Sequence, residues 1–242
     1  MAETTSRQSQ LTLNLNLRDS ATFDSYVAGP NSQAVTYLRR LAGHGWEPGV
    51  YLWGAPGTGK SHLLQAVCHA AGTAGAAAVY LPMEIADRFP SEALNGLENL
   101  SRICIDDIEA IAGRRDWEIA LVHLIDRVQA AGGGLVVTGH AAPLALGLEL
   151  LQLSSRLAGG LTLQLHALDE ADKLQALQLR AARRGLALTV EAGRYLVRHY
   201  GQDMNRLFAA LETVDRASLA AQRKLTIPFM RDVLGSSILK TD

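Results

Sequence analysis

The chain has 242 residues, enough for one large domain or a medium domain with a small appendage. Hydrophobic residues make up 48% and charged residues 19% of the sequence, which excludes a disordered chain. The formal net charge of -1 argues against a dedicated nucleic-acid binder, because such domains are strongly basic.

The chain contains two cysteines, Cys68 and Cys104, and neither belongs to a CxxC or Cys/His pattern. This spacing excludes a zinc site and a disulfide scaffold, so we expect two buried, reduced thiols. The sequence has no apolar run near the roughly 20 residues of a membrane span. It also lacks the pattern of a secretory signal, and we therefore expect a cytoplasmic protein.

Leucines alternate with other residues near the start of the chain, at Leu11, Leu13, Leu15 and Leu17. A spacing of two predicts an extended segment with one apolar face. No turn leads to a nearby partner strand. The segment therefore either packs on its own domain or docks on another protein.

Five short apolar segments alternate with helical patterns in the next part of the chain. The predicted strands are 49–53, 77–81, 100–105, 135–138 and 161–165, and the clearest predicted helices are 60–71 and 117–130. Such alternation predicts an α/β fold, with a five-stranded parallel sheet and helices on both of its faces.

After residue 166 the pattern predicts helices alone. They cover 169–184, 189–200, 203–222 and 228–234, with Gly185 ending the first and Pro228 in the first turn of the last. We therefore expect three parts: an extended segment over 1–22, an α/β domain over 23–166 and a small all-helical lid over 167–242.

Residues 54–61 have the pattern GxxxxGK(S/T) between a predicted strand and a predicted helix. The glycines let successive backbone N–H groups surround a polyphosphate, and the helix start adds partial positive charge. Lys60 is expected to reach the β- and γ-phosphates, and the Ser61 hydroxyl to ligate Mg²⁺. The predicted binding residues are Gly54, Pro56, Gly57, Thr58, Gly59, Lys60, Ser61 and His62.

The third predicted strand is followed by Asp106 and Asp107. We expect this strand beside the P-loop strand, with Asp106 holding the water shell of the metal. Asp107 takes the position where many P-loop proteins carry a glutamate that polarises the attacking water. Its shorter side chain predicts slow hydrolysis. Without the P-loop, the same pair would indicate only the capped start of a helix.

Thr138 and His140 lie at the end of the fourth predicted strand. A polar side chain there can contact the γ-phosphate or the attacking water, so Thr138 is a candidate catalytic residue, with a structural role as the alternative. For His140 we favour a solvated loop position over a phosphate contact.

Two arginines are further candidates. Arg156 precedes the fifth predicted strand, where ring-forming ATPases carry an arginine that acts on a neighbour's nucleotide; a plain surface arginine is the alternative. Arg206 lies in the first turn of a predicted helix, where the helix dipole disfavours a cation. That placement favours a contact with the phosphates across the domain junction over an ordinary exposed position.

Together these residues resemble the AAA+ module of DnaA-type initiators. The resemblance rests on the P-loop with the HLLQA that follows it, on Asp-Asp-Ile at 106–108, Thr-Gly at 138–139, Ser-Ser-Arg at 154–156 and the helical lid. It is strongest to the Hda family of regulatory inactivators of DnaA. The segments 172–181, 215–218 and 222–229 resemble the lid of that family, and 10–15 resembles its sliding-clamp-binding peptide.

The resemblance implies a regulator of replication initiation that binds ADP or ATP with Mg²⁺. With the DNA-loaded sliding clamp, the β subunit of DNA polymerase III, it would promote hydrolysis of DnaA-bound ATP. Val27 and Asn31 would contact the adenine, Arg156 would act in trans, and the clamp would bind Gln10, Leu11, Leu13 and Leu15. Asn14 replaces the proline often found in the clamp peptide.

The expected partners are therefore DnaA and the clamp, with a homodimer left open, and neither sequence-specific DNA binding nor a membrane is expected. Intrinsic ATPase activity would be weak. Two other functions stay open: a DnaC-like helicase loader that uses its own ATP hydrolysis, and a nucleotide-binding module with a structural role.

Overall fold

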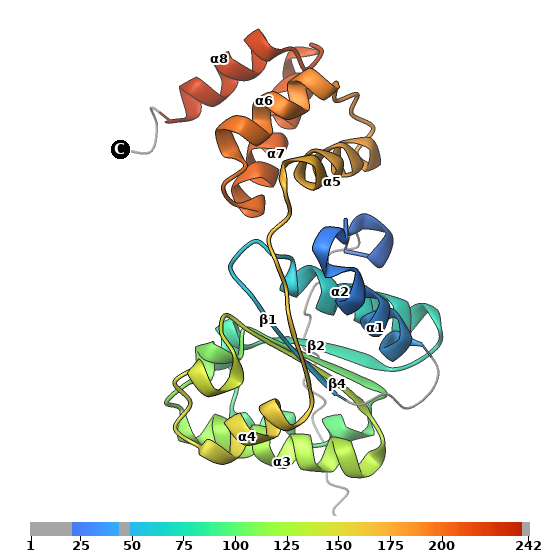
Figure 1. Cartoon of the computed structure of the whole chain (residues 1–242), viewed down its shortest axis with the longest axis vertical. Helices are drawn as coiled ribbons and strands as arrows, with labels where there is room; N and C mark the ends of the chain where they lie inside the picture. Colours follow the sequence, from blue (N-terminus) through green and yellow to red (C-terminus); the bar gives the residue numbers. More distant parts are fainter. Residues whose placement is uncertain (1–20, 44–48, 239–242) are drawn as a thin grey trace, which may run out of the picture.

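The protein is described here by a computed structural model in which residues 21–43 and 49–238 are placed (Figure 1). A layered α/β part carries a separate group of four helices, which follows it in the chain. Within the described residues, no helix is both long enough and apolar enough to cross a membrane.

The sheet is parallel and has five strands in the order β2-β3-β4-β1-β5, which confirms the predicted fold class. The strands are β1 (Val50–Trp53), β2 (Ala78–Pro82), β3 (Arg102–Asp106), β4 (Gly134–Gly139) and β5 (Leu161–Gln164).

The expectation that the strand before Asp106 lies beside the P-loop strand is wrong. β4 pairs with both β1 and β3 and so separates them. All six residues of β4 are buried, and a strand that is apolar on both faces is most stable in the middle of a parallel sheet.

Four α-helices cover the two faces of the sheet (Figure 1). α1 (Ser32–Ala42) and α2 (Lys60–Thr73) pack on Leu52, Cys104 and Val136. α3 (Arg115–Ala131) and α4 (Leu151–Gly159) pack on the opposite face, which includes Ile105 and Val137. Neighbouring strand residues thus alternate between two cores, as the period of two requires. Cys68 and Cys104 are buried and free, as expected.

Short 3₁₀ turns connect these elements. They are η1 (Phe23–Ser25), η2 (Gly29–Asn31), η3 (Met83–Arg88), η4 (Ser91–Leu94), η5 (Leu97–Asn99), η6 (Ile108–Ile111) and η7 (Pro143–Ala145).

The C-terminal helices form a separate, third core around Leu177, Leu196, Leu207 and Met230. They are α5 (Glu170–Arg183), α6 (Val190–Tyr200), α7 (Met204–Ala221) and α8 (Ile227–Ile238). All four predicted helices are present, and α8 extends beyond its predicted end. The N-caps follow the sequence: Asp169 accepts from the Asp172 N–H at 2.8 Å, and Thr189 from the Ala192 N–H at 3.2 Å.

Candidate nucleotide-binding site

The P-loop joins the end of β1 to the start of α2. Gly57 and Gly59 have φ values of +79° and +92°, in the left-handed region that favours glycine. Gly59 is the N-cap residue of α2 and gives the helix no side-chain cap. The first N–H groups of α2 therefore have no side-chain acceptor at the cap, which is the arrangement that binds phosphate.

Lys60 lies against this loop. Its side chain is 8% exposed, and its Nζ donates to the Gly54 carbonyl at 2.9 Å. Thr58 Oγ1 donates to the Ala55 carbonyl, also at 2.9 Å. The loop is thus closed by hydrogen bonds from its own side chains, and the Lys60 ammonium lies against the loop backbone.

Asp106 ends β3 and is 1% exposed. Its carboxylate accepts from Thr138 Oγ1 at 2.5 Å and from Tyr80 Oη at 2.6 Å. Thr138 also accepts from the Asp107 N–H at 3.0 Å. Because β4 lies beside β3, Thr138 joins the two acidic residues into one network. The structure therefore brings three predicted residues together and adds Tyr80, which the sequence did not single out.

Asp107 lies next to this network in the left-handed region, with a φ of 52°. Burial, and then the charges of Asp106 and Glu109, raise its pKa to about 6, while the nearby charge of Lys60 opposes the shift. A carboxyl group with a pKa near neutral can accept a proton, which is the property a general base for water needs.

A magnesium ion fits the residues present. The Asp106 carboxylate and the Ser61 hydroxyl are oxygen donors, which Mg²⁺ prefers, and Mg²⁺ sites in such proteins are completed by substrate phosphates and water. Accordingly, no group of three or more His, Cys, Asp or Glu side chains in the described part of the chain could hold a metal by itself.

The segment before α1 packs over the P-loop. Tyr26 Oη donates to the Thr58 carbonyl at 2.9 Å, and its ring lies so close to Gly59 that a Cβ there would come within 2.5 Å of it. His62 Nε2 lies 2.9 Å from the Thr22 carbonyl oxygen. His62 is thus bonded to this segment, and the ring of Tyr26 covers one side of the loop.

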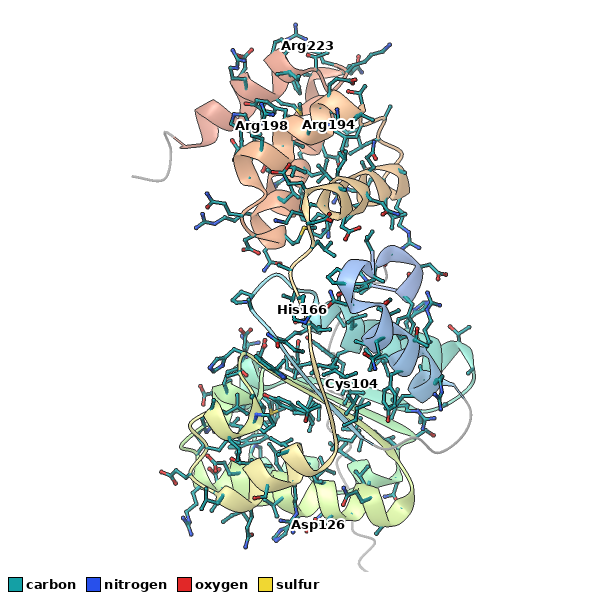
Figure 2. All side chains as sticks on the ribbon, viewed as in Figure 1. Cys104, Asp126, His166, Arg194, Arg198 and Arg223 are labelled. Carbon is teal, nitrogen blue, oxygen red and sulfur yellow. The ribbon has the colours of Figure 1, made fainter. Side chains whose placement is uncertain are left out.

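Asn31 and Val27 lie at the junction between the sheet and the lid. The buried Asn31 side chain donates to the His166 carbonyl at 2.9 Å and accepts from the His166 N–H at 2.7 Å. His166 belongs to the segment that leads from β5 to α5 (Figure 2). Val27 packs against the core of the lid. Asn31 thus holds the segment that leads to the lid, and Val27 contacts the lid itself.

Arg156 lies on α4, on the face of the sheet opposite to α2. Its Nε and Nη2 donate to the two carboxylate oxygens of Asp126 at 2.6 and 2.8 Å. Figure 2 shows Asp126 at the end of the molecule remote from His166 and the lid. Arg156 is therefore placed away from the P-loop of its own chain.

His140 and Arg206 are both exposed. His140 lies beyond β4 with its Nδ1 3.0 Å from a carboxylate oxygen of Glu109. Arg206 lies in the first turn of α7, and no contact between it and the P-loop is found among the described residues. Asp203, the N-cap residue of α7, lies against Gly57 instead. The predicted clamp-binding residues Gln10, Leu11, Leu13 and Leu15 lie outside the described residues.

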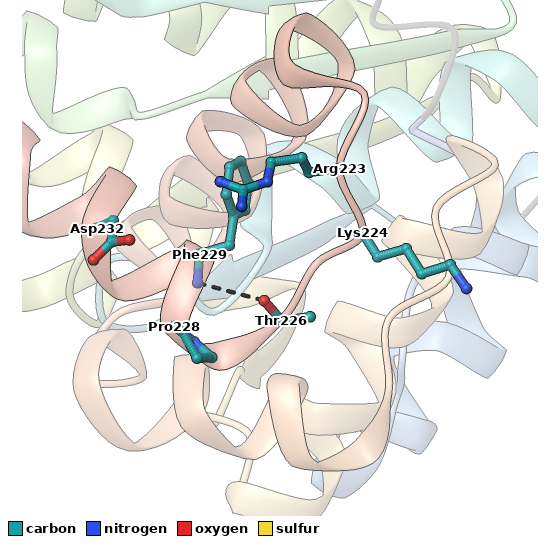
Figure 3. Close-up of a pocket in the computed structure, with 6 residues that line it drawn as sticks. All are labelled: Arg223, Lys224, Thr226, Pro228, Phe229 and Asp232. Carbon is teal, nitrogen blue, oxygen red and sulfur yellow. Dashed lines mark hydrogen bonds between the residues drawn. The ribbon is translucent and has the colours of Figure 1, made fainter.

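A separate hollow of about 300 Å³ lies on the lid (Figure 3). It is lined by Arg223, Lys224, Thr226, Pro228, Phe229 and Asp232. The Arg223 guanidinium lies 5.9 Å from the centre of the Phe229 ring. This hollow shares no residue with the P-loop and belongs to a different part of the fold.

A parallel sheet with a P-loop after β1, acidic residues at the end of β3, a polar residue on β4 and a helical lid defines an AAA+ P-loop protein. The model of the bacterial DnaA ATPase domain matches residues 17–164, and the chain belongs to that family. Its C-terminal part matches the model of the Hda lid domain over residues 169–234. The chain is thus an Hda/DnaA-related AAA+ protein.

Solved structures agree on the fold. Domain III of the replication initiation protein DnaA from Thermotoga maritima superposes with a TM-score of 0.81 at 20% identity, over 91% of this chain and 98% of that one. AMPPCP-bound DnaA from Aquifex aeolicus gives 0.70 at 19% identity, over 82% of this chain and 66% of that one. RuvB, the Holliday junction branch migration motor of Thermotoga maritima, superposes with a TM-score of 0.64 at 16% identity, over 87% of this chain and 67% of that one.

Proposed function

We propose that the chain is a nucleotide-bound regulator of replication initiation, which promotes hydrolysis of the ATP bound to DnaA. One observation carries this proposal. α2, which follows the P-loop, and α4, which carries Arg156, pack on opposite faces of the sheet in one AAA+ module whose C-terminal helices match the Hda lid. An arginine so placed can serve the nucleotide of a neighbouring molecule and not its own.

The site would hold ADP or ATP through the P-loop. The N–H groups at the start of α2 would bind the phosphates, and Lys60 would leave the Gly54 carbonyl to pair with them. Ser61 and Asp106 would hold Mg²⁺, which neutralises phosphate charge when it is bound. Nucleotide binding is also supported by a DnaA neighbour with AMPPCP bound.

Intrinsic hydrolysis would be slow. Thr138 and Tyr80 fix the Asp106 carboxylate, and Thr138 also holds the backbone of Asp107. Asp107 would then act as the base toward water. Because aspartate is one methylene shorter than glutamate, it reaches less far toward the attacking water.

Arg156 would stabilise the charge that develops on the phosphoryl group of DnaA-bound ATP. Its pairing with Asp126 fixes the guanidinium on the surface of α4 with both carboxylate oxygens engaged. On binding to the phosphates of a partner molecule, the guanidinium N–H groups of Arg156 would leave the Asp126 carboxylate and donate to phosphate oxygens instead.

The clamp would bind the N-terminal peptide in extended form. Gln10 would form hydrogen bonds, and Leu11, Leu13 and Leu15 would supply apolar side chains at a spacing of two. Such docking would bring the AAA+ module to DnaA on DNA.

A co-purification experiment with DnaA and with DNA-loaded clamp tests this function, in the presence and absence of ADP. We expect the full chain to retain both partners, and a chain without residues 1–17 to lose the clamp while its melting temperature stays within about 2 °C. Failure of the full chain to retain either partner would overturn the proposal.

The second function, a helicase-loader-type ATPase, is favoured by the complete set of Lys60, Asp106, Asp107 and Thr138. Steady-state hydrolysis separates the two. Multiple rapid turnovers by the isolated chain would favour the loader, whereas stimulation of ATP hydrolysis on DnaA would favour the regulator.

A further inference from the structure

The lid contacts the phosphate-binding loop at Gly57. A Cβ atom built on Gly57 would collide with Asp203 Oδ1 and would lie 3.2 Å from the Met204 backbone nitrogen. The start of α7 therefore lies directly on the P-loop. Of the lid residues near Gly57, Asp203 is the one that carries a negative charge.

The position of the Asp203 carboxylate is fixed by the helix it caps. Asp203 has extended backbone angles, and its Oδ1 accepts from the Asn205 N–H at 3.0 Å. The same oxygen is the one that contacts Gly57. The side chain is thus held by α7 at the surface of a loop whose N–H groups attract anions.

Among the described residues, no ion pair joins the Asp203 carboxylate to a cation. Lys60, the cation of the loop, is bonded to the Gly54 carbonyl, and Arg206 in the same turn as Asp203 forms no ion pair among the described residues. The Asp203 carboxylate, which lies against the loop, and a phosphate group bound to the loop repel each other, and the repulsion grows with the number of phosphate charges.

We propose that Asp203 sets the phosphate preference of the site: its carboxylate disfavours a triphosphate more than a diphosphate and so shifts binding toward ADP. This inference rests on the proposed nucleotide binding. The negative charge of Asp203, and not its capping hydrogen bond, is what distinguishes the diphosphate from the triphosphate.

The test is the affinity of the full chain for ADP and for a non-hydrolysable ATP analogue, both with Mg²⁺, measured by calorimetry for the wild type and for Asp203→Asn. Asparagine caps a helix about as well as aspartate, so the variant removes the charge and keeps α7. Magnesium complexes of ATP carry about one more negative charge than those of ADP. We expect affinity to rise about threefold for ADP and about tenfold for the analogue.

The matched control is Asp169→Asn, which makes the same change at the N-cap of α5. It should leave both affinities unchanged. The gain from Asp203→Asn should also shrink as salt rises from about 0.05 to about 0.5 M, because screening weakens a charge effect and not a packing effect.

Equal changes for the two nucleotides, or no change, would overturn the role of Asp203 while leaving nucleotide binding intact. A wild-type chain that binds neither nucleotide would remove the proposed function and this inference together. A melting temperature of Asp203→Asn within about 2 °C of the wild type shows that the lid is still folded.

Discussion

Glu118 on α3 is the residue whose replacement should perturb the fold most clearly. Its side chain is fully buried, at 0% exposed. One carboxylate oxygen accepts from the N–H groups of Gly113 and Glu149 at 2.9 and 3.1 Å, and the other accepts from the Leu150 N–H at 2.7 Å. Leu150 is the N-cap residue of α4. A single carboxylate thus joins the start of α3 to the start of the helix that carries Arg156.

Glu118→Gln replaces one acceptor oxygen with an NH₂ group. At least one backbone N–H then faces a donor inside the protein. A hydrogen bond to a charged group contributes about 1.5–3 kcal/mol, so we expect the free energy of unfolding to fall by about 2–3 kcal/mol. Glu118→Ala leaves all three N–H groups without their acceptor and should lower it by about 4 kcal/mol or more.

Urea denaturation followed by circular dichroism measures these differences. The control is Glu149→Gln, at an exposed neighbouring position, which should change the free energy of unfolding by less than about 0.5 kcal/mol. If Glu118→Gln also stayed within about 0.5 kcal/mol of the wild type, the three bonds would not hold α4 as described.

Asn31→Ala removes both side-chain bonds to the His166 backbone and should lower the unfolding free energy by about 2 kcal/mol in urea titrations. The raised pKa of Asp107, about 6, means that the folded chain holds this proton more tightly than the unfolded chain. The Asp107 carboxyl group therefore makes the free energy of unfolding fall as pH rises from about 4 to about 6. When urea denaturation midpoints are measured against pH, Asp107→Asn should flatten this part of the profile. Lys60→Ala should weaken ADP binding at least about tenfold in calorimetry, because a charge-assisted contact is lost.

Local sequence patterns predicted much of the fold and part of the site. The P-loop glycines and the apolar runs of the strands act over a few residues, and they are found where the pattern placed them. The N-cap bonds of Asp169 and Thr189 are equally local, because each side chain accepts from an N–H three residues further on. The Asp106–Asp107 pair could be read in the same way, because it directly follows an apolar strand.

The remaining features depend on contacts between distant segments. The prediction that β3 lies beside β1 was wrong, because β4 lies between them. The central place goes to the strand that is buried on both faces, and only the assembled sheet shows which strand this is. Tyr80, Glu118 and Asp203 meet partners about 26, 32 and 146 positions away, and no local pattern marks them. α1 and α4 were not predicted, although the buried positions 34, 35, 38, 41 and 42 of α1 have helical spacing.

The central claim, that Arg156 acts on the nucleotide of DnaA, is tested most directly by single-turnover hydrolysis of ATP preloaded on DnaA in the presence of DNA-loaded clamp. The wild-type chain should accelerate hydrolysis, and Arg156→Ala should abolish the acceleration while its own nucleotide affinity and melting temperature stay unchanged. Arg156→Lys should restore little, because a point charge lacks the guanidinium fork. Stimulation by Arg156→Ala equal to that of the wild type would contradict the account.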